Sequence, residues 1–187
     1  MLWFTIGYLF TFTLLAIFKK NYEFLYYTII LSILIFIIVL YHKKIHLTKH
    51  ILLGLTILGA MHIFGGNIHF FGTRLYDIYF IPGLLKYDNI VHSFGIFVAT
   101  FVVYSFLHPH LDKQIDHNAV LLSLILISIT MGIGAFNEVL ELGAVVFFGA
   151  AKQVGDYINN AVDLVFNLIG SVIACFFIIR HHKRKLF

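Results

Sequence analysis

The chain has 187 residues, of which 60% are hydrophobic and 12% are charged, and its formal net charge is +4. A soluble domain carries about a quarter charged residues, so this composition excludes an ordinary soluble protein and places the chain in a lipid bilayer. Its Lys and Arg residues flank apolar stretches, and we therefore expect membrane lipids and no nucleic acid as partners. The single cysteine, Cys175, lies in the last apolar stretch and cannot form an intrachain disulfide.

Six apolar stretches can each supply a membrane span, which needs about 20 residues of helix. Because backbone groups cannot stay unpaired in hydrocarbon, we predict an all-α, polytopic membrane helical bundle with about six transmembrane helices. The stretches are residues 2–18, 24–41, 51–66, 89–107, 119–151 and 161–179. They form one integral-membrane domain over 1–187, with an N-terminal hairpin and basic connector (1–50), a four-helix core that carries the motifs (51–180) and a basic tail (181–187).

Two of these apolar stretches allow more than one structural interpretation. Residues 2–18 could be a cleaved signal peptide, but no basic region precedes them and no small-residue cleavage site follows, so we expect a helix that pairs with 24–41. The stretch 119–151 is too long for one straight crossing. We expect its span at about 120–142, with residues 143–151 as an interfacial or re-entrant continuation.

Lysine and arginine counts set the expected orientation through the positive-inside rule. If the N-terminus is inside, the cytoplasmic side holds eight of these residues and the outer side holds five. The outer five are Lys19, Lys20, Arg74, Lys86 and Lys152. This bias predicts a multi-pass membrane protein with both termini in the cytoplasm.

Ionisable and amide side chains gather at one end of the last four spans. The end of span three, the start of four, the end of five and the start of six face the same side of the membrane in either orientation. The residues concerned are His62, Asp88, His92, Glu138, Glu141, Asn160, Asp163 and Asn167. Those of each span recur at intervals of three or four positions, so each set lies on one helix face. We expect Asp88, His92, Glu138, Glu141 and Asp163 to meet in one pocket.

Carboxylates at close range must be neutralised by protons or cations. Carboxylate and imidazole groups together suit Zn, Mn or Fe, whereas an all-oxygen subset suits Mg. The predicted metal ligands are His62, Asp88, His92, Glu138, Glu141 and Asp163. A structural role is the alternative, because buried polar groups, asparagine above all, also hold membrane helices together.

The order of these motifs resembles a bacterial membrane-protein family. The series H-x2-GG-x2-H, YD-x3-H, NE-x2-E and GD-x6-D-x3-N-x2-G is similar to the YjdF-type inner-membrane proteins and, more distantly, to the VanZ-like family. The resemblance covers about residues 60–170. Some VanZ-like members are linked to glycopeptide-antibiotic resistance, but the resemblance implies no settled reaction.

Two classes of function fit these residues. The first is a metal-dependent membrane hydrolase or transferase that acts on a lipid-like or isoprenoid-linked substrate, with a turn at Gly65 and Gly66 that permits close backbone approach. Its catalytic residues would be Glu138, Glu141, Asp156 and His69, and its substrate-binding residues Arg74, Lys86, Lys152, Asn160 and Asn167. The second is a proton- or cation-coupled transporter, or a non-enzymatic accessory protein of the envelope, whose acids form a relay or an ion site. The oligomeric state is open.

Overall fold

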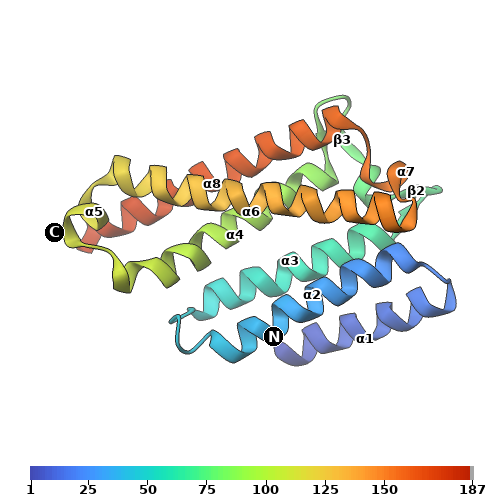
Figure 1. Ribbon diagram of the computed structural model, residues 1–187, viewed down its shortest axis with the longest axis horizontal. Coiled ribbons are helices and arrows are strands. Elements are labelled where there is room, and N and C mark those ends of the chain that lie inside the picture. Colours follow the sequence, from blue (N-terminus) through green and yellow to red (C-terminus); the bar gives the residue numbers. More distant parts are fainter. Residues whose placement is uncertain (186–187) are drawn as a thin grey trace.

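The computed structural model describes residues 1–185, so the end of the basic tail predicted at 181–187 lies outside the described residues. Within them, six long helices run side by side along the molecule (Figure 1). They are α1 (Leu2–Phe18), α2 (Tyr22–Tyr41), α3 (Lys49–Asn67), α4 (Tyr87–Leu107), α6 (Ala119–Phe148) and α8 (Tyr157–Lys185). Five of the six are long and apolar enough to span a membrane, and α1 is a shorter apolar helix of 17 residues. The prediction of an all-α, multi-pass bundle is confirmed.

The helices form two groups that meet mainly where α3 packs against α4, with a smaller contact between α2 and α6 (Figure 1). One group holds α1, α2 and α3, and the other holds α4, α6 and α8, in which the contact between α4 and α8 is the most extensive. Small residues permit the close approach in the second group. A Cβ at Gly170 of α8 would overlap the backbone oxygen of Ser93 on α4, and one at Gly134 of α6 would overlap the side chain of Asn167.

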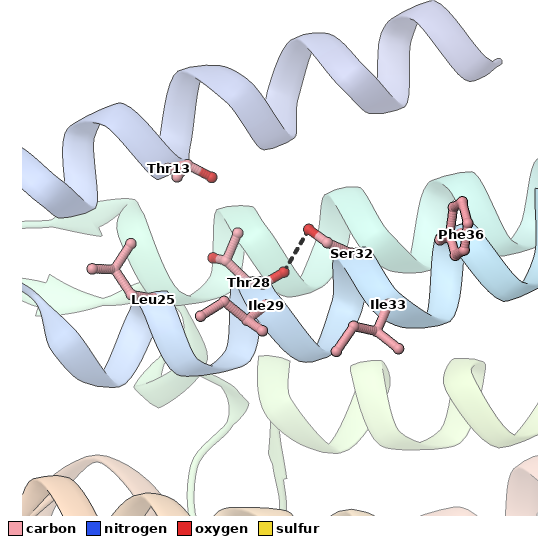
Figure 2. A pocket seen from close by; sticks show the side chains of 7 residues that line it. All are labelled: Thr13, Leu25, Thr28, Ile29, Ser32, Ile33 and Phe36. Atoms are coloured by element: carbon pink, nitrogen blue, oxygen red, sulfur yellow. Dashed lines mark hydrogen bonds between the residues drawn. The ribbon is translucent and has the colours of Figure 1, made fainter.

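Helices α1 and α2 form the predicted hairpin, and most of their apolar side chains are exposed. Their hydroxyl groups bond within their own helices. Thr13 donates to the carbonyl oxygen of Leu9 at 2.7 Å and Thr28 to that of Phe24 at 2.8 Å, while Ser32 donates to Thr28 at 2.7 Å. Figure 2 shows Thr13, Thr28 and Ser32 along a groove between these two helices.

The connector between α3 and α4 contains short strands that the sequence analysis did not predict. Strands β1 (His69–Phe70) and β2 (Thr73–Arg74) form one antiparallel hairpin, and β3 (Tyr79–Ile81) and β4 (Leu85–Lys86) form another, with the 3-10 turn η1 (Leu75–Asp77) between the two hairpins. Phe71 and Gly72 have φ angles of 50° and 84°. Positive φ at both central residues is the geometry that a two-residue hairpin turn needs. The second hairpin delivers Lys86 to the start of α4.

One expectation about α6 is corrected. Residues 143–148 continue this helix without a break, so they form no separate re-entrant segment. The helix ends at Gly149, whose φ of 68° is the left-handed conformation common just beyond helix ends. The one-turn helix α7 (Ala151–Val154) then leads to α8. At the opposite end, η2 (His108–His110) and α5 (Lys113–His117) connect α4 to α6.

The glycine pair at the end of α3 also differs from expectation. Gly65 and Gly66 are helical rather than part of a turn. A Cβ at Gly65 would lie 2.9 Å from the ring of Tyr76 and 3.0 Å from that of Tyr87. Gly65 therefore makes room for aromatic packing, and Gly66 faces the ring of Phe24 in the same way.

Candidate metal centre

Five ionisable side chains from three helices meet near the connector end of the bundle. They are Asp88 and His92 from the first two turns of α4, Glu138 and Glu141 from the second half of α6, and Asp163 from the second turn of α8. The ring of His92 lies within 3.9 Å of a carboxylate oxygen of each acid. All five side chains are largely buried, from 0% exposed for Asp163 to 18% for Asp88. The expected meeting of these residues is observed; we call them the acidic cluster.

The two ring nitrogens of His92 face different acids. Nε2 lies 3.5 Å from Asp88, 3.8 Å from Glu141 and 3.9 Å from Asp163, while Nδ1 lies 3.7 Å from Glu138. Most of these separations are longer than a hydrogen bond. Two ligand atoms that share one ion, with bonds of about 2.1 Å at angles of about 110–130°, lie roughly 3.4–3.8 Å apart. The separations between Nε2 and the three oxygens around it therefore suit a shared ion better than direct hydrogen bonds.

Two groups of three residues could each hold a metal ion. One is Asp88, His92 and Asp163, and the other is His92, Glu138 and Glu141. In each group, the potential ligand atoms lie within 4.8 Å of one another. His92 belongs to both groups, so the two candidate ligand sets share its ring.

Buried polar atoms without a hydrogen-bond partner are concentrated in the same part of the bundle. In the part of the chain that the structure describes, these atoms belong to Tyr8, Glu138, Asn160 and Asn167. Both carboxylate oxygens of Glu138 are among them. Buried polar groups in proteins are nearly always paired. The unpaired oxygens of Glu138 thus fit a site that takes a cation or a polar ligand.

Two amides hold the carboxylate of Asp163. Asn89 donates from Nδ2 to Oδ1 at 3.0 Å, and Asn159 donates from Nδ2 to Oδ2 at 2.7 Å. Asn137 donates in the same way to Glu141 at 2.8 Å. Partners of this kind orient metal-binding carboxylates. The sequence analysis assigned none of these asparagines to the site, although Asn159 lies one helical turn before Asp163.

Lys86 supplies a positive charge at the edge of the acidic cluster. Its Nζ lies 2.8 Å from Asp88 Oδ2 and also donates to Asn159 Oδ1, and its side chain is only 13% exposed. Burial opposes the ammonium charge, but nearby acidic groups, Asp88 first among them, together outweigh burial and raise the pKa of Lys86. Lys86 therefore stays charged. Its predicted contact with a substrate head group stays a prediction.

The other two predicted head-group ligands lie in the connectors. Arg74 forms a two-pronged ion pair with Asp77 at 3.0 and 3.1 Å, and its Nη2 donates to the carbonyl oxygen of Gln153 at 2.6 Å. These bonds tie the first hairpin to α7. Lys152 is exposed on α7.

Three further predicted site residues have no hydrogen bond or ion pair to the acidic cluster among the described residues. His62 shares a hydrogen bond of 2.6 Å between its Nδ1 and the hydroxyl of Tyr76, and its ring lies edge-on to that of Tyr27. His69 is exposed on β1. Asp156 is exposed and accepts from the backbone N–H of Asn159 at 3.0 Å, next to the start of α8.

The helices and the acidic cluster define a multi-pass α-helical membrane protein with a histidine–carboxylate site between its helices. The chain belongs to the family described as Predicted membrane protein (DUF2238), which it matches over residues 1–184. No curated protein and no solved structure matches it significantly. The family description names a membrane location and no reaction, so a function has to be argued from the site.

Proposed function

We propose that the protein is a divalent-metal-dependent membrane enzyme, a hydrolase or transferase that acts on a lipid-like or isoprenoid-linked substrate. The observation that carries this proposal is the position of His92 among four largely buried carboxylates. With Lys86 as their cationic neighbour, the four acids have an excess of negative charge. A carboxylate within a transmembrane helix is costly, and a divalent ion offsets that cost.

The positions of these residues suggest a different role for each in such a centre. His92 through Nε2, with Asp88, Glu141 and Asp163, would hold the ion. One imidazole with several carboxylates suits Zn, Mn or Fe, and an all-oxygen subset suits Mg. Glu138 faces the other ring nitrogen, Nδ1, at 3.7 Å. This distance is too long for a hydrogen bond, so both oxygens of Glu138 stay available to a polar ligand.

A bound divalent ion supplies the means to polarise a phosphate or ester oxygen and to lower the pKa of water. The remaining roles fall to side chains of the chain itself. Glu138, with both oxygens unpaired, is the group best placed to accept a proton, and Asn160 and Asn167 offer unpaired amide atoms to a polar group of the substrate. We assign the base to Glu138 rather than to His69 or Asp156, which are exposed.

Elemental analysis of the protein purified in mild detergent tests the proposal. We expect about one divalent ion per chain, or binding of one on titration with Zn, Mn, Fe and Mg. Removal of the ion with a chelator should lower the melting temperature, because the ion binds the folded state. A protein that contains no ion and binds none of the four contradicts the metal-enzyme proposal.

One observation favours a second candidate, a proton- or cation-coupled transporter. On α8, the buried residues Asn167 and Ser171 continue inward from Asp163, and the hydroxyls of Ser171 and Thr130 lie 2.8 Å apart. This polar row leads from the acidic cluster toward the middle of the bundle, where Leu126 is wholly buried one turn beyond Thr130. Proton or cation flux into liposomes that contain the protein would favour transport over catalysis.

We also propose the inner membrane of a bacterial-type cell, with both termini in the cytoplasm. The support is the eight-to-five distribution of Lys and Arg and the resemblance to YjdF-type and VanZ-like proteins. Thr73 and His110 are exposed at opposite ends of the bundle, and Cys175 is buried. In intact cells, a membrane-impermeant thiol reagent should label a cysteine placed at 73 but not one at 110. The reverse result would invert the orientation and leave the acidic cluster unchanged.

A further inference from the structure

We propose that Lys86 is an exchangeable counter-ion: a divalent ion displaces its ammonium from Asp88, and the ammonium then binds an anionic group of the substrate, such as a phosphate. This inference rests on the proposed metal centre and names the chemical class of its substrate. The inference follows from the positions of the two carboxylate oxygens of Asp88. The same carboxylate that would bind the ion through Oδ1 is already paired with Lys86 through Oδ2.

The contacts of Lys86 bridge two helices at the edge of the site. Its backbone N–H donates to Asn89 Oδ1 at 3.0 Å, which fixes the start of its side chain. Its Nζ reaches Asp88 on α4 and Asn159 on α8, and Asn159 in turn donates to Asp163. The ammonium is therefore joined to two proposed ligands, one directly and one through an amide.

Charge makes this position exchangeable. Without an ion, the ammonium offsets part of the negative charge of the four acids. With a divalent ion bound to Asp88, the ammonium and the ion repel each other, and the carboxylate gives up electron density to the stronger cation. A lysine has a flexible four-carbon stem and three rotatable donors, so its charge can move while its backbone stays fixed.

The released ammonium would lie next to the ion, where a substrate anion needs a second positive charge. Neighbouring cations are less suited to that task. Arg74 is held by Asp77 and by the carbonyl oxygen of Gln153, and Lys152 is exposed on α7. A lysine serves as a point charge for phosphate. Lys86 thus couples the arrival of the ion to recognition of an anionic head group.

The first experiment compares Mn²⁺ and Zn²⁺ binding by metal-stripped wild type, Lys86→Gln and Lys152→Gln in detergent, by calorimetric titration. Glutamine keeps a donor for Asn159 and removes the competing charge. We expect Lys86→Gln to bind the ion about tenfold more tightly than wild type, because a nearby like charge has been removed. The matched control Lys152→Gln should stay within about twofold, because exposed charges are screened.

The outcomes separate the two proposals. If wild type binds neither of these ions, nor Fe or Mg in the titration described above, the proposed metal centre is overturned. Binding by wild type, with equal or weaker binding by Lys86→Gln, overturns the counter-ion inference alone and makes Lys86 a structural support for Asp88.

A second measurement uses the wild type and does not depend on the folding of a variant. The rate of acetylation of Lys86 by an amine reagent, followed by mass spectrometry, should rise when Mn²⁺ is added, while that of Lys152 stays constant. An unchanged or slower reaction at Lys86 contradicts displacement of its ammonium.

A third measurement tests the anion on the Mn²⁺-loaded protein. Inorganic phosphate or short-chain phosphatidic acid should raise the melting temperature of wild type but not of Lys86→Gln. A shift with phosphate identifies a free anion, and a shift with phosphatidic acid alone identifies a lipid head group. Equal shifts in both proteins, or none in either, overturn the anion part of the inference.

Discussion

The N-terminal hairpin of α1 and α2 and the group of α4, α6 and α8 are both built from apolar helices, yet the threonine and serine hydroxyls of the first find different partners from the carboxylates and amides of the second. In the hairpin, Thr13, Thr28 and Ser32 bond to carbonyl oxygens one turn earlier in the same helix. In the second group, Asn89 bonds to Asp163 across 74 positions, and both oxygens of Glu138 have no hydrogen-bond partner. A polar residue in a membrane helix is therefore informative when its partner lies on another helix or when it has none.

The two regions also differ in how closely their backbones approach. Gly7 of α1 has open space around it, whereas Gly170 of α8 faces the backbone of Ser93 on α4. The first region is a hairpin whose apolar side chains are mostly exposed, and the second is a tightly packed unit that positions a site. Four experiments can break or sharpen this contrast.

The largest effect is expected from Gly170→Ala. The added Cβ would overlap a backbone oxygen that cannot move away as a side chain can, so the variant should lose about 3 kcal/mol of stability or more. The matched change Gly7→Ala meets no atom and should stabilise α1 by about 0.5–1 kcal/mol. Thermal unfolding in detergent measures both. Similar behaviour of the two variants would show that α4 and α8 are not packed as described.

The next effect concerns charge in the acidic cluster. Glu141→Gln keeps the size of the side chain and removes a charged ligand, so metal affinity should fall roughly a hundredfold, and Asp88→Asn should act likewise. The control Glu23→Gln changes a partly buried acid of α2 outside the cluster and should leave metal binding unchanged.

In the metal-free proteins, the same substitution should raise stability, whereas it lowers metal affinity. Neutralising one of several neighbouring carboxylates relieves repulsion. Metal-free Glu141→Gln should therefore melt at a higher temperature than metal-free wild type. A lower melting temperature would indicate that Glu141 supports the fold through its bond from Asn137.

The smallest effect separates bonds between helices from bonds within one. A double-mutant cycle of Thr130→Val and Ser171→Ala should give a coupling energy of about 0.6 kcal/mol, the average for such pairs in membranes. The corresponding cycle of Thr28→Val and Ser32→Ala should give a coupling near zero, because each hydroxyl bonds to a backbone oxygen. Equal couplings would remove the distinction between the two regions.

Much of this architecture could be predicted from the sequence. Long apolar stretches located the six helices, and the predicted span 2–18 has the same bounds as α1. The meeting of Asp88, His92, Glu138, Glu141 and Asp163 followed from two local facts: spacings of three or four residues place side chains on one face, and successive spans alternate in direction. Neither fact requires knowledge of which helices pack together.

What the sequence did not reveal depends on tertiary distances. Lys86 donates to Asn159, which lies 73 positions later, and no local sequence pattern predicts that hydrogen bond. The strands of the connector have two or three residues each, too few for a periodic pattern. His62 looked like a ligand by position, but its bond to Tyr76 depends on how the connector folds back over α3.

The unbroken length of α6 has a consequence for the depth of the site. Its 30 residues span about 45 Å, whereas the hydrocarbon core of a bilayer is about 30 Å thick. Glu138 and Glu141 lie 19 and 22 positions after Ala119, or about 29–33 Å along the helix axis. If α6 enters the hydrocarbon near Ala119, both acids emerge at the far interface, level with the lipid head groups. The length of the acyl chains, and with it the thickness of the membrane, then determines how much water reaches the acidic cluster.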